Sequence, residues 1–324
     1  MTVPSSAIFR ADLLGLFSAT APQMQQFVVR EIMPEMPVEG ATGEYGKLPA
    51  SSFLSPPGKN VRRQRNAARA RSSTVLEDAL YAVREFSFEE MVDKTDERYA
   101  GPNADLVSVA AAIAADKVRL GQEIELAEEM QDTTKYPTTG TTGLVVGTPW
   151  DDFAAATPRA DISEGKEALL NKGGEQDVYL RITRKQHWCL SQCEQILEVL
   201  KYTRAPEAEL PLPELASALG VAGITLCTAR QMITAPGADE PKAAPIWSDQ
   251  HASLYVRHEG EMVGKSFGFG RSLVLSGDDG QMVYSYEEPS RNAELAVAEE
   301  HVDVHVVFPE AHFHLGNVIT APGG

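Results

Sequence analysis

Basic residues are few in this sequence. Lys and Arg together number 29 against 46 Asp and Glu, and the formal net charge is -17 at pH 7. A protein that binds nucleic acid through its phosphates needs Lys and Arg clustered over much of one face. The composition therefore argues against bulk attraction to DNA or RNA.

Cysteine is scarcer still, since the 324 residues contain three, Cys189, Cys193 and Cys227. An odd number of cysteines in a chain long enough to bury a core argues against a disulfide framework and favours a reducing compartment. A zinc site is disfavoured as well, because Cys189 and Cys193 have no second close pair. We interpret all three as small core residues.

Membrane spans and the common catalytic motifs are missing too. No stretch reaches the ~18 apolar residues of a transmembrane helix, and the N-terminus lacks a secretion signal, so we expect a soluble intracellular chain. The segment FGFGRS at 267–272 lacks the third glycine of a phosphate loop, and no Gly-X-Ser-X-Gly elbow occurs. Asp151 and Asp152 are adjacent and therefore point in different directions. The sequence shows no recognisable catalytic residue and no cofactor site, and we therefore expect a protein that is not an enzyme. We also expect no membrane contact.

The longest helical pattern covers residues 102–132. Pro102 and Asn103 give a start signal, Asp105 places an acid in the first turn, and no further proline occurs before Pro137. At about 1.5 Å per residue this helix is a rod of roughly 45 Å. Residues spaced three and four apart predict an inward face made of Leu106, Val109, Ala110, Ile113, Ala114, Lys117, Leu120, Ile124 and Ala127. The other face is polar and mostly acidic.

The rest of the chain shows a mixed pattern, which predicts an α+β fold. Residues 1–38 indicate an extended arm, and the glycines and prolines that follow favour a hairpin or loop. Later helices are predicted at 161–172, 184–202 and 212–219, the last one stopped by Gly220. Strands are predicted at 177–182, 224–228, 246–256, 267–275 and 302–308.

One short segment reverses the charge of the chain. Residues 59–71 contain no acid and carry Lys59, Arg62, Arg63, Arg65, Arg69 and Arg71. The segment is either a solvated loop, a nucleic-acid patch, or a surface attracted to the acids of another copy. A nucleic-acid patch lacks the usual interleaved aromatics, and we favour the third interpretation. The acidic face of the long helix supplies the candidate partners Glu123, Glu125, Glu128 and Glu129.

Histidines gather near the C-terminus, at His301, His305, His312 and His314. Four imidazoles are enough to bind a transition metal. The alternative is that they line the polar side of half-buried strands, because His301 and His305 alternate with valines. We favour this alternative and assign no metal.

Five segments share an order and a spacing: TPWDDFAAATPRADISEGKEALL at 148–170, LEVLKYT at 197–203, LASALGVAGITLC at 215–227, IWSDQHASLYV at 246–256 and VDVHVVFPEAHFHLGNVI at 302–319. Together they resemble the major capsid proteins of tailed double-stranded-DNA bacteriophages, which have the Hong Kong ninety-seven type of capsid fold. The resemblance covers about half the chain by motif and the rest by layout.

The resemblance implies a division of the chain and a function. The parts are an N-terminal arm (1–38), an extended loop that reaches a neighbouring subunit (39–84), a peripheral domain (85–156) with 102–132 as its spine helix, an axial domain (157–245) and return strands of both domains (246–324). The implied function is that of a structural major capsid protein, which is made in the cytoplasm of the bacterial host. It self-assembles into hexamers and pentamers of the icosahedral head of the virion.

The resemblance also implies partners. The shell encloses double-stranded DNA without sequence-specific binding, and portal, scaffold or cement proteins are further candidates. The same fold forms non-viral nanocompartments that enclose enzymes, which is the nearest alternative. A metal-binding protein that uses the C-terminal histidines is a more distant one.

Overall fold

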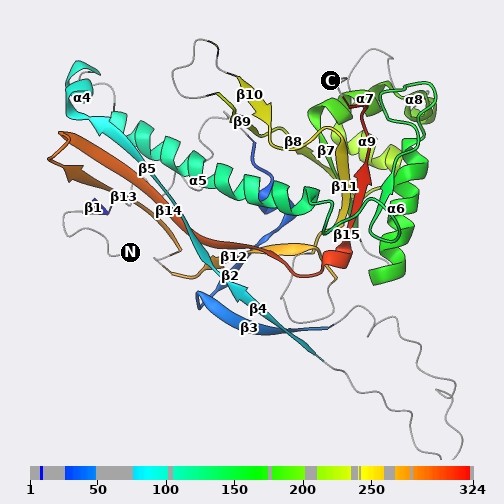
Figure 1. Ribbon diagram of the computed structural model, residues 1–324, viewed down its shortest axis with the longest axis horizontal. Helices are drawn as coiled ribbons and strands as arrows, with labels where there is room; N and C mark the ends of the chain where they lie inside the picture. The colour runs from blue at the N-terminus through cyan, green and yellow to red at the C-terminus, as the bar shows by residue number, and fades with distance from the viewer. Residues whose placement is uncertain are drawn as a thin grey trace, which may run out of the picture.

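The structure is a computed structural model that describes residues 8–9, 26–48, 76–100, 105–173, 177–200, 210–234, 240, 242–258, 267–277 and 280–321. Two β-sheets lie at opposite ends of the molecule, and one long helix runs from the first toward the second (Figure 1). The basic segment 59–71 and the start signal at Pro102 and Asn103 lie outside the described residues. None of the described helices combines the length and apolar character needed to cross a membrane.

The first sheet, called here the β14 sheet, contains the longest strands. Its order is β1-β13-β14-β12-β2, and β5 also pairs with β14. The bounds are β1 Ile8–Phe9, β2 Glu35–Val38, β5 Arg84–Asp93, β12 Gly270–Leu275, β13 Gln281–Glu288 and β14 Ala293–Val306. Strands β5 and β13 were not predicted from the sequence, and β14 begins nine residues before the predicted strand 302–308. All pairings are antiparallel except that of β2 with β12.

Helix α5, Leu106–Gln131, lies along the β14 sheet (Figure 1). It follows α4, Lys94–Ala100, and its N-cap is Asp105, whose side chain accepts a hydrogen bond from the backbone N–H of Ser108 at 3.0 Å. Small side chains form the contact with the sheet: Ala110, Ala111, Ala114 and Ala115 pack with Ala296, Ala298 and Val283. Small residues at such a contact let a helix axis approach its neighbour closely.

The prediction of the inward face of this helix was only partly right. Ala110, Ala114 and Ala127 are buried as predicted, but Val109 and Ile113 are 55% and 40% exposed. The predicted start was also too early, since Asp105 caps the helix instead of lying in its first turn. Apolar residues occur on both sides of the first three turns, so periodicity alone did not show which side the sheet covers.

The second sheet, called here the β11 sheet, has the order β6-β15-β11-β7-β8. Its strands are β6 Gly143–Val145, β7 Val178–Thr183, β8 Gly223–Cys227, β11 His251–Val256 and β15 His312–Gly316. Helices α6 Pro158–Gly173, α7 Arg184–Gln192, α8 Glu194–Leu200 and α9 Leu212–Leu219 cover its apolar face (Figure 1). Helix α6 approaches closely at Gly165, where an added Cβ would lie 2.4 Å from Leu254 Cδ1.

Several predicted elements of this part are confirmed. Helix α6, strand β7, strand β8 and helix α9 lie where the sequence places them, and Gly220 ends α9 with φ at 69°. The predicted single helix 184–202 is wrong, because Cys193 adopts an extended conformation and separates α7 from α8. The first residues of the predicted strand 246–256 form turns instead. The cysteine interpretation is confirmed, since Cys189, Cys193 and Cys227 are free and buried.

Residues 26–38 join the two sheets instead of extending away as part of an arm. Val28, Val29, Ile32 and Met33 are buried in the main core, around the short helix α2 Val29–Ile32. Strand β2 follows directly and adds a parallel edge to the β14 sheet. The assignment of the whole of 1–38 to an arm is therefore wrong for this segment, whose apolar strip is core.

Two antiparallel strand pairs stand apart from both sheets (Figure 1). One is β3 Thr42–Lys47 with β4 Glu77–Ala82, called here the ribbon. The other is β9 Arg230–Met232 with β10 Ala243–Pro245, called here the hairpin. A short 3-10 helix, Pro309–Ala311, connects β14 to β15.

Candidate assembly surfaces

The ribbon, formed by β3 and β4, stands out from the rest of the described subunit (Figure 1). Leu80 on β4 is 73% exposed, and Leu76, which directly precedes β4, is 49% exposed. A two-stranded ribbon is marginally stable without a further surface to pack against. Exposed leucines on such an element therefore indicate a surface that another molecule covers.

The base of the ribbon rests on a small apolar cluster. Val38 and Leu273 are buried there, and Tyr45, Tyr81 and Val83 pack against them. The ring of Tyr81 covers Gly43 on the paired strand, where an added Cβ would lie 2.5 Å from the ring. The ribbon is thus attached at its root while its other end leads into the segment with the basic residues.

Of the four predicted acidic partners, Glu125, Glu128 and Glu129 are accessible near the C-terminal end of α5. Glu128 is exposed, Glu129 forms an ion pair with Lys135, and a carboxylate oxygen of Glu125 lies 3.8 Å from Nη1 of Arg84. Burial raises the pKa of Glu125, Arg84 lowers it, and Asp303, Glu128 and Glu129 raise it further. This local excess of negative charge favours an incoming cation.

The prediction that Glu123 faces a neighbouring copy was wrong. Glu123 is fully buried and accepts hydrogen bonds from the backbone N–H groups of Val28 and Val29 and from the indole N–H of Trp247. Burial raises its pKa, while these three donors lower it. A glutamate that precedes Leu126, Ala127 and Met130 by three, four and seven residues shares their buried face, and that spacing was the available signal.

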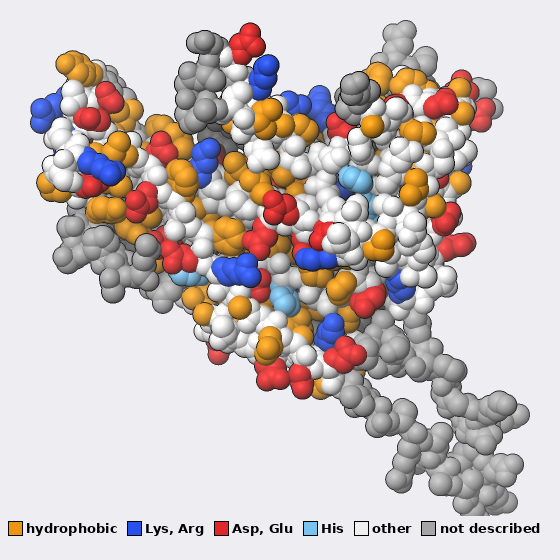
Figure 2. All heavy atoms as spheres, viewed as in Figure 1, with side chains coloured by type: hydrophobic (Ala, Val, Ile, Leu, Met, Phe, Trp, Pro, Cys, Tyr) orange, Lys and Arg blue, Asp and Glu red, His pale blue; other side chains and the backbone are white. Residues whose placement is uncertain are grey.

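A second exposed apolar surface lies at the other end of α5. Val109 and Ile113 are one helical turn apart, and Tyr99 on α4 is 86% exposed. Hydrophobic side chains are visible over this end of the molecule in Figure 2. The hairpin adds Met232 and Ile233, which are also exposed. Large apolar side chains left uncovered in groups mark contact surfaces.

The structure divides the C-terminal histidines between the two sheets. His301 and His305 lie on β14, while His312 and His314 lie on β15 and are fully buried. His314 Nε2 lies 2.9 Å from Nδ1 of His251, and His305 lies beside Asp303. No group of three or more His, Cys, Asp or Glu with a metal-binding arrangement occurs among the described residues.

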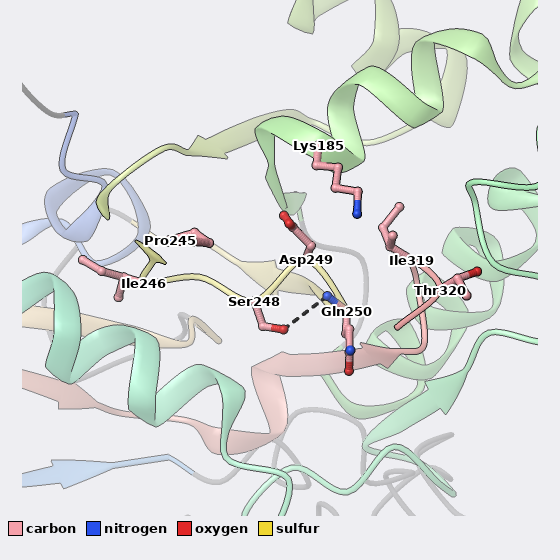
Figure 3. Close-up of a pocket in the computed structure, with 8 residues that line it drawn as sticks. All are labelled: Lys185, Pro245, Ile246, Ser248, Asp249, Gln250, Ile319 and Thr320. Carbon is pink, nitrogen blue, oxygen red and sulfur yellow. Dashed lines mark hydrogen bonds between the residues drawn. The ribbon is translucent and has the colours of Figure 1, made fainter. Parts of the chain in front are cut away.

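An open pocket of about 350 Å³ lies beside the loop that precedes β11. Figure 3 shows Lys185 extending from α7 toward this loop, with Asp249 on the same side. Asp249 accepts a hydrogen bond from the Thr183 hydroxyl at 2.5 Å, within the N-terminal cap of α7. Ser248 also serves local structure, since its Oγ accepts a hydrogen bond from the backbone N–H of Gln250 at 3.2 Å.

Comparison with solved structures identifies the fold. A phage-related protein from Bordetella bronchiseptica RB50 matches with a TM-score of 0.71 and 19% identity, over 96% of this chain and 98% of that chain. The capsid of cyanophage P-SCSP1u matches with a TM-score of 0.58 and 10% identity, over 92% and 90%. The mature capsid of bacteriophage PhiM1 matches with a TM-score of 0.51 and 13% identity, over 95% and 90%. No family model and no curated protein matches the sequence.

The two sheets, the long helix and the projecting ribbon therefore define this chain as having a phage capsid fold. The particular fold is the Hong Kong ninety-seven type that the sequence resemblance predicts, and the α+β prediction is confirmed.

Proposed function

We propose that this chain is a structural major capsid protein, which self-assembles into the icosahedral head that encloses a phage genome. The observation that carries the proposal is the fold match over almost the whole of both chains, at a TM-score of 0.71 for one phage-related protein. The exposed apolar residues of the ribbon, the hairpin and α5 support the proposal, because groups of exposed apolar side chains mark surfaces that bind another molecule. The function is structural, and the subunit works in the virion capsid after synthesis in the bacterial cytoplasm.

Contact between copies would take place through the ribbon and the segment that it carries. The basic residues Lys59, Arg62, Arg63, Arg65, Arg69 and Arg71 would meet Glu125, Glu128 and Glu129 on α5 of the next copy. An exposed ion pair contributes about 0 to 1 kcal/mol, so no single pair holds the shell together. Several pairs in each contact, repeated over every subunit, set the register and strengthen the whole.

The apolar residues complete this contact. The exposed Leu76 and Leu80 follow the basic segment in the sequence. The exposed Val109 and Ile113 lie on α5, the helix that also contains the acidic residues. Burying a large apolar side chain contributes about 1.5 to 3 kcal/mol. In this arrangement burial supplies most of the affinity, and the charges select the orientation. A contact between two different surfaces suits a closed ring of five or six copies.

The net charge of -17 has a further role in the proposal. A wall with negative charge does not adsorb packaged DNA strongly, so the genome remains mobile inside the head. DNA is thus enclosed without sequence-specific binding. Portal, scaffold or cement proteins are the further partners that a phage head would need.

Charge reversal tests the contact directly. Changing Arg62, Arg63 and Arg65 to Glu should abolish shells while the subunit keeps its circular dichroism spectrum and its unfolding midpoint. Changing Glu125, Glu128 and Glu129 to Lys in the same chain should restore assembly. As a control, three Lys substitutions at Glu164, Glu167 and Glu198, on α6 and α8, should not restore it. Normal shells from the first variant would contradict the proposed contact.

The contents of purified shells separate a virion from a compartment for enzymes. Shells recovered from phage-producing cells should contain double-stranded DNA. A co-purifying enzyme in place of DNA would overturn the phage assignment while leaving the shell.

A further inference from the structure

The root of the ribbon meets strand β14 through a chain of polar side chains. The Tyr45 hydroxyl lies 2.8 Å from His305 Nε2, and His305 Nδ1 lies 3.2 Å from Asp303 Oδ2. Asp303 Oδ2 also accepts a hydrogen bond from the backbone N–H of Ala82 at 3.3 Å. Tyr45 belongs to β3 and Ala82 to β4, so this chain of contacts ties both ribbon strands to the β14 sheet.

The order of these side chains fixes which group donates and which accepts each hydrogen bond. The carboxylate beside Nδ1 favours the imidazole tautomer that carries its hydrogen there, and Nε2 then accepts from the Tyr45 hydroxyl. Burial is the main reason that the pKa of Tyr45 is raised to about 12, and Asp303 adds to it, so Tyr45 keeps the hydrogen that it donates. His305 and Asp303 are each less than a fifth exposed, which limits competition from water.

The other contacts between the ribbon and the rest of the subunit constrain the angle of the ribbon less. Its apolar base buries Val38 and Leu273, but apolar contact tolerates rotation because it depends on area. Lys47 reaches the Val307 carbonyl at 3.4 Å and lies 5.4 Å from the centre of the Phe308 ring. Hydrogen bonds, by contrast, weaken steeply when their angles change. The Tyr45–His305–Asp303 contacts therefore add hydrogen bonds at the root whose geometry favours one angle.

We infer that Tyr45, His305 and Asp303 are positioning residues that set the angle at which the ribbon leaves the subunit. The inference rests on the proposed function, in which this angle decides where residues 49–75 meet the next copy. A narrow range of angles restricts the curvature of the contacts and gives shells of one size. A loose angle allows contacts of different curvature.

A distance measurement on the unassembled full-length chain tests the angle itself. Spin labels are placed on the ribbon at Asp78→Cys and on α5 at Lys117→Cys, both exposed, while the native cysteines are buried. The parent chain should give one narrow distribution of distances. Tyr45→Phe, which removes a single oxygen, and His305→Phe should each at least double its width. The matched controls Tyr81→Phe and His301→Phe, on the same ribbon and the same strand, should leave it unchanged.

Unchanged widths in both Tyr45→Phe and His305→Phe would overturn the inference, provided that their unfolding midpoints show folded chains. Electron microscopy then reads the consequence for assembly: Tyr45→Phe should give shells of mixed size, and Tyr81→Phe shells of one size. If the parent chain forms no shells, the proposed function fails. The distance measurement still tests the positioning role in that case.

Discussion

Trp247 donates its indole N–H to the carboxylate of Glu123 at 2.6 Å, across 124 residues of sequence. The same carboxylate accepts the backbone N–H groups of Val28 and Val29 at 2.9 and 3.2 Å. Glu123 lies on α5, Trp247 precedes β11, and the two valines begin α2. One buried side chain thus connects the long helix, the approach to the β11 sheet and the N-terminal segment.

Removing this carboxylate should destabilise the subunit strongly. Glu123→Ala leaves three buried donors without an acceptor and opens a space, so we expect a loss of about 3 kcal/mol or more in the free energy of unfolding. Urea denaturation of the unassembled chain measures it. Glu128→Ala, on the exposed face of the same helix, should change it by less than about 0.5 kcal/mol. Similar losses in the two variants would contradict the role of Glu123.

Acid should destabilise the β11 sheet through its histidines. Burial is the main cause that lowers the pKa of His251, His312 and His314, that of His314 to about 4, and the buried Arg181 guanidinium adds to it in each case. Lys172 lowers the pKa of His312 further, and the ring of Tyr136 packs on that of His312.

The direction of this pH dependence follows from the difference in proton binding between the folded and the unfolded chain. A histidine whose pKa is lower in the folded state binds fewer protons there, so its stabilisation is complete above pH 6.5 and is lost as the pH falls toward 4. For His314 the loss in the free energy of unfolding is about 3 kcal/mol. Thermal unfolding midpoints between pH 7 and pH 4 measure it.

A single substitution isolates the effect. His312 makes no hydrogen bond to the described residues, and its ring lies between Tyr136 and Phe269 at centroid distances of 4.4 and 5.2 Å. His312→Phe should therefore keep or raise the stability at pH 7 and weaken the loss in acid. His301→Gln on β14 is the control and should keep the parent profile. A His312→Phe chain with the full acid sensitivity would count against this assignment.

The three thiols should be inert in the folded subunit. Burial raises the pKa of Cys189 to about 11 and that of Cys193 to about 12, and it raises the pKa of Cys227 well above its usual value. Because the thiolate is the reactive form, a thiol reagent at pH 8 should modify all three only after unfolding. Mass spectrometry of the native chain counts the modified residues. Rapid modification without unfolding would show that a thiol is accessible.

Two neighbouring positions on α5 test which face the sheet covers. Ala114 is fully buried, and Ile113 is 40% exposed. Ala114→Glu should cost about 3 kcal/mol or more in unfolding free energy, because it places a carboxylate against the β14 sheet. Ile113→Glu should cost less than about 1 kcal/mol and still prevent assembly. A larger cost for Ile113→Glu than for Ala114→Glu would contradict the burial of Ala114 against the β14 sheet.

Local patterns were enough for elements with clear ends. Gly220 stops α9, and the alternation of Val178–Thr183 marks β7, so both lay where predicted. The parallel pairing of β2 with β12 joins residues more than 230 positions apart, and no local pattern encodes it. Helix α5 was predictable as a helix, but alanines do not show which face is buried when valine and isoleucine stand beside them.

The candidate sites were harder to predict, because their contacts join residues that are far apart in the sequence. Glu123 stands in an acidic run, and only the surrounding core turns it from a surface charge into a buried acceptor. Tyr45 and His305 are 260 residues apart, so their contact depends on the ribbon's position. Arg30 likewise reaches Glu300 only because α2 lies against the β14 sheet. The basic segment was visible at once, since charge is a property of composition.

Electron cryo-microscopy of the purified, assembled protein tests the central proposal most directly. We expect closed icosahedral shells in which each ribbon crosses to the next subunit and residues 59–71 lie within ion-pair distance of Glu125, Glu128 and Glu129 on its α5. Monomers or dimers at assembly concentrations, or shells in which the ribbon folds back on its own subunit, would contradict it.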